Sequence, residues 1–311
     1  MPITTVAKHW VNYVEDISTA HATIIIILTA ICFGLVPWFA KELLDSGIAS
    51  PAIAFYRYIL TAILFFPVLR FTNALKKECY WAIFSGACVG LGWVGYVEAL
   101  KVVPVSSVSV IYMTYPLVTL VASWALIGNV PNKQSIFAGF LILIAAVISF
   151  MPNTLSSSAM KALLVAFSAP IAFGLAIAIL TDKLHNLSPI QRLAGFSAGA
   201  SLGLLPLLIN LEYDQVIPAD PALWSHIIAL ALATALIPQY LYTTLAPLIG
   251  PAKSAMAGSF ELPTMFLVGF LIFNESIGTI QILSGVLVLM AILITPAISS
   301  NRRVTKFEAG S

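Results

Sequence analysis

Long apolar segments alternate with short polar connections along most of this 311-residue chain. A membrane-spanning helix needs about 20 mostly apolar residues. Turn-forming residues such as Asp45-Ser46-Gly47 and Pro218-Ala219-Asp220-Pro221 separate the segments. The pattern predicts an all-α integral membrane protein with ten transmembrane helices. They are expected at residues 22–44, 51–70, 79–100, 104–128, 133–151, 160–181, 188–210, 222–246, 251–273 and 279–298.

Composition agrees with a chain whose solvent is the bilayer. Apolar residues make up 60% and charged residues 9% of the chain, against about 25% charged residues in soluble domains. The net charge of +2 comes with no basic stripe, so no nucleic-acid partner is expected. Cys32, Cys79 and Cys88 form no CxxC motif and are interpreted as small apolar side chains. We therefore expect no disulfide framework, no metal site and no cofactor.

The ends of the chain and its basic residues predict an orientation. Residues 1–21 mix basic and acidic positions and do not resemble a cleaved signal peptide, so they are interpreted as a cytoplasmic N-terminal segment. Residues 299–311 are interpreted as a cytoplasmic tail. Basic residues favour the cytoplasmic side, and an inside amino terminus places most of them there. These are Lys8, Arg70, Lys76, Lys77, Lys133, Lys183, Arg302, Arg303 and Lys306, against Lys41, Lys101 and Lys161 outside. Both termini are therefore predicted to be cytoplasmic.

The two halves of the chain, residues 22–151 and 160–298, resemble each other. Phe33-Gly34-Leu35 corresponds to Phe173-Gly174-Leu175, and Pro116 corresponds to Pro263. Because each half holds an odd number of spans, the second half must enter the membrane from the opposite side. This predicts two inverted five-helix repeats around a central cavity near the midplane.

The motifs of the fourth and ninth spans resemble a known family. Ile111-Tyr112-Met113-Thr114-Tyr115-Pro116-Leu117, and Ser259-Phe260-Glu261-Leu262-Pro263 followed by Asn274-Glu275, are similar to the EamA type of the drug/metabolite transporter superfamily. The resemblance covers residues 22–298. It implies a ten-helix basket with a cavity lined mainly by the first four helices of each repeat. It also implies transport of small metabolites without ATP in a bacterial inner (plasma) membrane. Gly128-Asn129 departs from the pattern, which argues against a symmetric scheme with two carboxylates.

Two charges inside the spans are candidate substrate-binding groups, because an ionisable side chain at membrane depth is expensive. Glu261 is expected about ten residues into the ninth span and two residues before the break at Pro263, where it could bind an amine or carry a proton. The alternative interpretation is that Glu261 is a buried, protonated side chain with a purely structural role. Arg57 could hold a carboxylate or form a structural pair with Glu98. Other charges are interpreted as interfacial anchors: Arg192, Lys253, Lys41, Glu42 and Lys101.

Aromatic and hydroxyl side chains recur on the same spans. Trp93 and Tyr96 share a helix face, as do Tyr112 and Tyr115. Together with Trp38, Tyr240 and Ser259, they are predicted to line the substrate cavity, although ordinary packing is the alternative for each ring. Prolines inside spans are expected to break helices and to act as hinges or gates; these are Pro37, Pro116, Pro238 and Pro263, with a further break at Pro170.

The combined features predict a secondary transporter. No GxxxxGK[ST] loop is present to bind ATP. His9, His21, His185 and His226 lie at or outside the span ends, so an enzyme is not expected. The preferred hypothesis is an exporter of amino acids or related zwitterions by alternating access. The alternatives are a multidrug or lipophilic-cation exporter, or a flippase for lipid-linked substrates. Small-residue ladders such as Gly195-x-x-x-Gly199 leave monomer and homodimer open.

Overall fold

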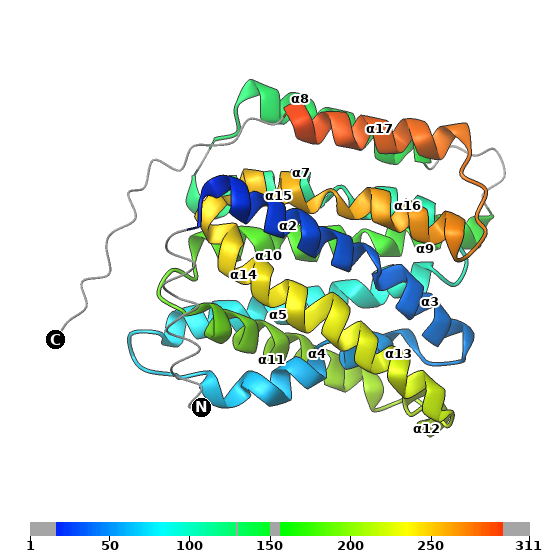
Figure 1. Ribbon diagram of the computed structural model, residues 1–311, viewed down its shortest axis with the longest axis horizontal. Coiled ribbons are helices and arrows are strands. Elements are labelled where there is room, and N and C mark those ends of the chain that lie inside the picture. Colours follow the sequence, from blue (N-terminus) through cyan, green and yellow to red (C-terminus); the bar gives the residue numbers. More distant parts are fainter. Residues whose placement is uncertain (1–16, 129, 150–155, 295–311) are drawn as a thin grey trace.

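The computed structural model describes residues 17–128, 130–149 and 156–294, and the predictions for residues 1–16 and 299–311 lie outside these ranges. The described residues form helices and no strands (Figure 1). The first half contains α2 (Thr19–Gly34), α3 (Val36–Asp45), α4 (Ser50–Phe65), the short η1 (Phe66–Val68), α5 (Lys76–Ala99), α6 (Val105–Tyr112), α7 (Tyr115–Ile127) and α8 (Lys133–Ser149). The second half contains α9 (Ser157–Ala166), α10 (Ser168–Asp182), α11 (Pro189–Leu208), α12 (Tyr213–Val216), α13 (Pro221–Ala231), the π-helical η2 (Leu232–Leu236), α14 (Ile237–Ile249), α15 (Pro251–Gly258), α16 (Glu261–Leu271) and α17 (Thr279–Ile294).

Several of these helices have the length and composition of membrane spans. In the described part, six continuous or nearly continuous helices qualify: Thr19–Asp45, Ser50–Val68, Lys76–Ala99, Val105–Leu126, Ser157–Asp182 and Pro221–Ile249. Shorter apolar helices occur at Lys133–Ile148, Glu261–Leu271 and Thr279–Ala291. The chain is thus a multi-pass membrane protein.

Four of the five predicted breaks are helix interruptions, and the fifth, at Pro238, follows a π-helical turn. Pro37 and Pro116 stand in the first turns of α3 and α7, and Pro238 follows η2 at the start of α14. Pro170 and Pro263 are each the third residue of their helices, α10 and α16. Proline lacks a backbone N–H and clashes with the preceding turn, whereas the first turn of a helix tolerates it. Pro37, Pro116, Pro170 and Pro263 therefore lie in the first turn of a new helix, whereas Pro238 lies in a helical run that continues from α13 through the π-helical η2. The action of these prolines as hinges stays a prediction.

Small residues allow the central helices to pack closely. A Cβ atom added to Gly86 of α5 would lie 1.9 Å from the carbonyl oxygen of Phe196 on α11. One added to Gly199 of α11 would lie 1.9 Å from the carbonyl oxygen of Ile83 on α5. Helices α4 and α10 pack on either side of this crossing, while α8 and α17 pack mainly on each other along one edge (Figure 1). The other helices therefore enclose the buried centre of the molecule, where a site can lie.

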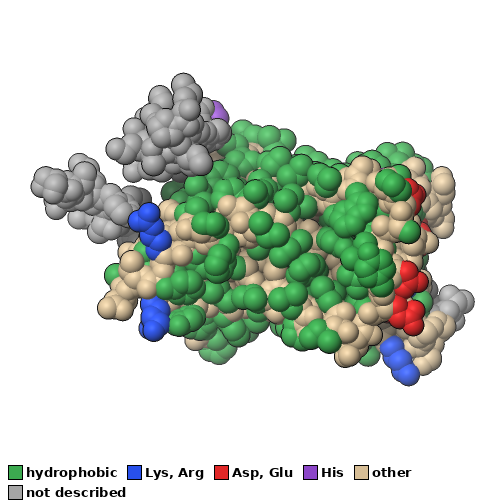
Figure 2. Space-filling view, turned by 90° about the horizontal axis from the view of Figure 1, so that it is seen from below, with side chains coloured by type: hydrophobic (Ala, Val, Ile, Leu, Met, Phe, Trp, Pro, Cys, Tyr) green, Lys and Arg blue, Asp and Glu red, His purple; other side chains and the backbone are tan. Residues whose placement is uncertain are grey.

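The surface separates into an apolar middle and two charged ends (Figure 2). Large apolar side chains are exposed along the helices, among them Phe140, Leu143 and Ile282. We call one end of the molecule the basic end; its helix ends and loops carry Arg70, Lys76, Lys77, Lys133 and Lys183. We call the opposite end the acidic end; it carries Asp45, Glu98, Glu212, Asp214, Asp220 and Glu275. An apolar belt between two polar ends is what a bilayer requires.

Candidate functional site

Two charged side chains lie buried at the centre of the molecule without a full set of partners. Glu261 is 1% exposed and Arg57 is 4% exposed. Arg57 Nη2 donates a hydrogen bond to the carbonyl oxygen of Thr234, at 2.9 Å. Within the described part, Arg57 Nε, Arg57 Nη1 and Glu261 Oε1 make no hydrogen bond. The ion pairs of this part lie elsewhere, at Lys41–Asp45, Lys101–Glu98 and His226–Glu42.

Glu261 lies at the break that was predicted in the ninth span. The span consists of two helices, and Glu261 is the first residue of α16, directly after the interruption at Ser259-Phe260. Glu261 thus stands at the N-terminal end of α16, which is the positive end of its helix dipole. A Cβ atom on Gly34 would lie 2.9 Å from the Glu261 carbonyl oxygen and 2.5 Å from Thr264 Cβ. The end of α2 therefore packs directly on the first turn of α16.

The Arg57 guanidinium is covered by aromatic rings. Its Cζ atom lies 4.3 Å from the ring centre of Trp93, 5.4 Å from that of Tyr58 and 5.9 Å from that of Phe33. A cation over a ring face is attracted by about 0.5–2 kcal/mol, with the larger values in dry surroundings. The rings therefore offset part of the cost of burying the charge.

A continuous set of rings surrounds this pair, and we call it the aromatic cluster: Phe33, Trp93, Tyr96, Tyr112, Tyr115, Phe173 and Tyr242. Neighbouring ring centres lie between 4.7 Å (Trp93–Tyr96) and 6.3 Å (Phe173–Tyr242) apart. All members are buried. The centre that was expected to be a cavity is thus filled by rings in this conformation. A small cavity of about 20 Å³ lies beside it, toward the basic end.

The structure brings together most of the residues predicted to bind substrate. They come from α4, α5, α6, α7 and the interruption before α16: Arg57, Trp93, Tyr96, Tyr112, Tyr115, Ser259 and Glu261. Tyr115 also donates a hydrogen bond to the carbonyl oxygen of Ala255, at 3.3 Å, so α7 is tied to α15. Their role in substrate binding is a proposal, developed below.

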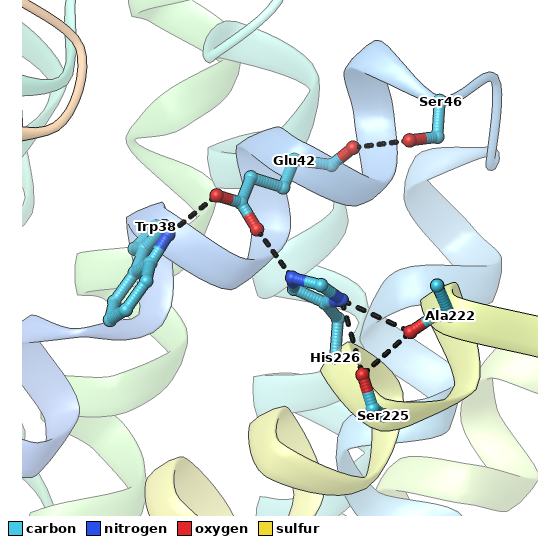
Figure 3. A network of polar contacts seen from close by, with 6 residues as sticks. All are labelled: Trp38, Glu42, Ser46, Ala222, Ser225 and His226. Atoms are coloured by element: carbon cyan, nitrogen blue, oxygen red, sulfur yellow. Dashed lines mark hydrogen bonds and ion pairs between the residues drawn. The ribbon is translucent and has the colours of Figure 1, made fainter.

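Two predicted residues lie apart from the aromatic cluster. Trp38, on α3, donates from Nε1 to the Glu42 carboxylate at 2.6 Å, and the other Glu42 oxygen lies 2.9 Å from His226 Nε2 on α13 (Figure 3). This network joins α3 to α13 near the acidic end. Tyr240, on α14, is only half-buried, and the ring contacts of the cluster go to Tyr242 instead.

Three members of the aromatic cluster were not predicted as site residues: Phe33, Phe173 and Tyr242. A signal for two of them was present in the sequence. Phe33 and Phe173 occupy matching positions in the two halves, so a site between the halves would expose both rings to it. The match was interpreted as a sign of the repeat alone.

The structure contradicts one of the two alternatives for Arg57 and the predicted anchor role of Arg192. Glu98 does not pair with Arg57, because its carboxylate accepts from Lys101 Nζ at 2.8 Å and from the Ser50 hydroxyl at 2.6 Å. Arg192 does not extend to the membrane surface. It is 9% exposed and donates to the carbonyl oxygens of Leu184, Thr243 and His185.

The arrangement of the buried side chains indicates a class of protein. A buried site with charged and aromatic side chains, placed at helix interruptions inside an apolar belt, is typical of membrane carriers. Among the described residues, no cluster of three or more His, Cys, Asp or Glu side chains is arranged to hold a metal.

Comparison with known proteins identifies the family. The EamA-like transporter family matches twice, over residues 21–151 and residues 160–296, so the chain belongs to this family of small-solute membrane transporters. No curated protein matches the sequence. Among solved structures, one described as "Crystal structure of protein" superposes with a TM-score of 0.61 at 16% identity, covering 89% of this chain and 96% of that chain. At that identity the similarity supports the fold alone.

Proposed function

We propose that this EamA-family member is a secondary transporter of amino acids or related zwitterions that works by alternating access. The observation that carries the proposal is the pair of incompletely bonded, oppositely charged side chains, Arg57 and Glu261, buried beside the aromatic cluster. The two side chains form no ion pair with each other. A solute with both charges would satisfy both groups together.

The chemistry of each side chain assigns its role. Arg57 offers Nε and Nη1 to a substrate carboxylate, and Glu261 offers Oε1 to an ammonium group. Trp93 and the tyrosines provide ring faces that attract the ammonium group and pack against an apolar side chain. Trp38 and Tyr240 are not part of this binding proposal, because neither belongs to the aromatic cluster.

The proposal includes an architecture and an orientation. Ten spans form two inverted repeats, 22–151 and 160–298, which rock against each other about the interruptions before Pro37, Pro116, Pro238 and Pro263. Both termini lie on the cytoplasmic side of the plasma membrane, because the basic end carries most of the Lys and Arg residues. The transported solute moves outward, and the protein acts as a monomer or homodimer without catalytic activity.

Counterflow in proteoliposomes tests the function. Wild type and the variants Arg57→Gln and Glu261→Gln would exchange a labelled amino-acid mixture, and Glu98→Gln would serve as a control that alters an exposed acid. We expect both site variants to lose at least tenfold in initial rate and the control to exchange like wild type. Unchanged exchange by either site variant would overturn its assignment.

The same assay separates the alternative substrates. A carrier of lipophilic cations needs Glu261 and the rings but not Arg57, so Arg57→Gln would then spare exchange of a quaternary-ammonium dye. A flippase for lipid-linked substrates would exchange neither solute while the protein stays folded.

A further inference from the structure

The small cavity beside the aromatic cluster lies between α5, α10, α11 and α14, toward the basic end. Its polar lining comes from Ser85, Arg192, Gln239, Tyr242 and Thr243, and apolar residues of α10, Leu184 and Phe196 complete the wall. A volume of about 20 Å³ admits about one water molecule. The cavity is thus closed in this conformation but has a polar side.

Arg192 brings a positive charge to this cavity with neutral partners. Nε donates to the carbonyl oxygen of Leu184 at 2.9 Å, Nη1 to that of Thr243 at 3.1 Å and Nη2 to that of His185 at 3.4 Å. A guanidinium carries five N–H groups, so these three bonds leave two for another acceptor. The nearby acid Glu78 is already engaged, since its Oε2 accepts from the backbone N–H groups of Asn186 and Leu187. The cavity therefore contains a buried cation without a paired carboxylate.

Tyr242 supplies a second, independent indication of a ligand. It is 2% exposed, and its hydroxyl makes no hydrogen bond in the described part of the chain. A buried hydroxyl without a partner is destabilising, because it has lost its hydrogen bonds to water. The same side chain lines the cavity together with Arg192. A small acceptor in the cavity would satisfy both groups.

The cavity adjoins the central site through two shared rings. Phe173 and Tyr242 line the cavity and also belong to the aromatic cluster, with ring centres 6.3 Å apart. Phe173 contacts Tyr115 at 5.0 Å, and Tyr242 contacts Phe33 at 6.0 Å. Phe33 in turn covers the Arg57 guanidinium, so these rings connect the cavity lined by Arg192 to the rings around Arg57. A solute passing from the basic end to the centre would meet Arg192 before Arg57.

We propose that Arg192 and the Tyr242 hydroxyl form a second carboxylate-binding subsite, on the basic-end side of the Phe173–Tyr242 rings. It holds the carboxylate of the transported solute before the rings part and Arg57 receives it. This role in transport rests on the proposed function, whereas carboxylate binding at Arg192 does not. Because the cavity admits about one water molecule, binding requires the Tyr242 ring to shift.

Propionate tests the subsite directly, because it carries a carboxylate and no amine. Its dissociation constant would be measured by saturation-transfer NMR with purified full-length protein in the Arg57→Gln background, which removes the central guanidinium. We expect binding to persist there, and Arg192→Gln to raise the dissociation constant at least tenfold. Arg192→Lys should recover part of the affinity because it restores the charge. Propylammonium serves as the matched probe of opposite charge and should bind no more weakly after Arg192→Gln.

Tyr242→Phe removes one hydroxyl and keeps the ring, so it tests the proposal even where Arg192→Gln does not fold. We expect it to raise the propionate dissociation constant at least threefold. An unchanged constant in Tyr242→Phe, or no propionate binding in the Arg57→Gln background, would overturn the subsite. Arg192-dependent propionate binding without any amino-acid counterflow would instead support the subsite and reject the proposed function.

Discussion

The substitution Gly258→Ala, at the last residue of α15, would test how tightly the site is packed around Tyr115. A Cβ atom at this position would lie 2.4 Å from the Tyr115 hydroxyl oxygen and 3.6 Å from Tyr115 Cζ, with no other atom within 4 Å. A flexible side chain could move away from such a contact. Tyr115 is fully buried between Phe173, with ring centres 5.0 Å apart, and Tyr112, at 5.4 Å. We therefore expect Gly258→Ala to force a shift of the ring or of α15.

The size of the effect follows from a double-mutant cycle. Overpacking of a tight core costs about 1–3 kcal/mol, while replacing glycine by alanine in a helix returns up to about 1 kcal/mol. Tyr115→Phe removes the clashing oxygen, together with a hydrogen bond worth about 0.6 kcal/mol in a membrane protein. The gain in helix propensity and the loss of the hydrogen bond each belong to one substitution alone, so they cancel in the cycle. The clash needs both the added methyl group and the Tyr115 oxygen, so it does not cancel. The coupling energy between the two substitutions should therefore be about 1–3 kcal/mol, with the double variant more stable than additivity predicts.

Reversible unfolding in mixed detergent micelles, followed by tryptophan fluorescence, would measure the four stabilities. Gly258→Ala in a Tyr242→Phe background is the matched control, because the Tyr242 hydroxyl is not among the atoms within 4 Å of the added methyl group. Its coupling should lie within about 0.5 kcal/mol of zero. Additive effects of Gly258→Ala and Tyr115→Phe would refute the packing described for the interruption before Glu261.

Three further predictions concern the helix crossing, a hinge and an exposed ion pair. Gly199→Ala should destabilise the protein more than Gly203→Ala in the same unfolding assay. The methyl group added at Gly199 would lie 1.9 Å from a backbone carbonyl oxygen, whereas the one added at Gly203 would lie 3.1 Å from a side-chain methyl carbon. Equal losses of stability would contradict this crossing geometry. Pro263→Ala should lower transport flux more than substrate affinity, since it restores a backbone N–H at the interruption; equal losses in both would reject the hinge. Glu98→Gln should cost less than about 1 kcal/mol, because its pair with Lys101 is 48% and 43% exposed and the glutamine carbonyl oxygen can still accept from the Ser50 hydroxyl. A larger loss would mean that the bond to Ser50 requires the charge.

Local backbone rules explain why the helix interruptions could be predicted. Proline removes a hydrogen bond in a helix interior, so Pro37, Pro116 and Pro263 favour interruptions, although Pro206 and Pro247 lie inside α11 and α14 without ending them. The pairing of Trp93 with Tyr96 follows in the same way from helical spacing, and their ring centres lie 4.7 Å apart. Features set by spacing along one helix were therefore predictable from the sequence.

The direction that each helix faces could not be predicted from the chain. Tyr240 and Tyr242 are two residues apart, which is about 200° around a helix, so only one of them can face the aromatic cluster. The π-helical η2 lies just before them, and an irregular turn of this kind changes the rotation of the following helix. Arg192 shows the same limit at a helix end, because the carbonyl groups of the preceding loop enclose it. Both outcomes depend on tertiary packing.

The incomplete bonding of Arg57 and Glu261 bears on substrate choice. Satisfying one buried charge while leaving its neighbour unpaired costs several kcal/mol. A solute with both charges avoids that cost, and one with a single charge does not, so discrimination comes partly from the group that is left unsatisfied. The two groups are not equivalent, however. Trp93 lies 4.3 Å from the Arg57 guanidinium and compensates part of that charge in the empty protein, whereas Glu261 Oε1 has no hydrogen-bond partner in the described part of the chain. A solute with only a cation therefore loses less affinity than one with only a carboxylate, which is why Arg57→Gln is the variant that separates zwitterion transport from cation transport.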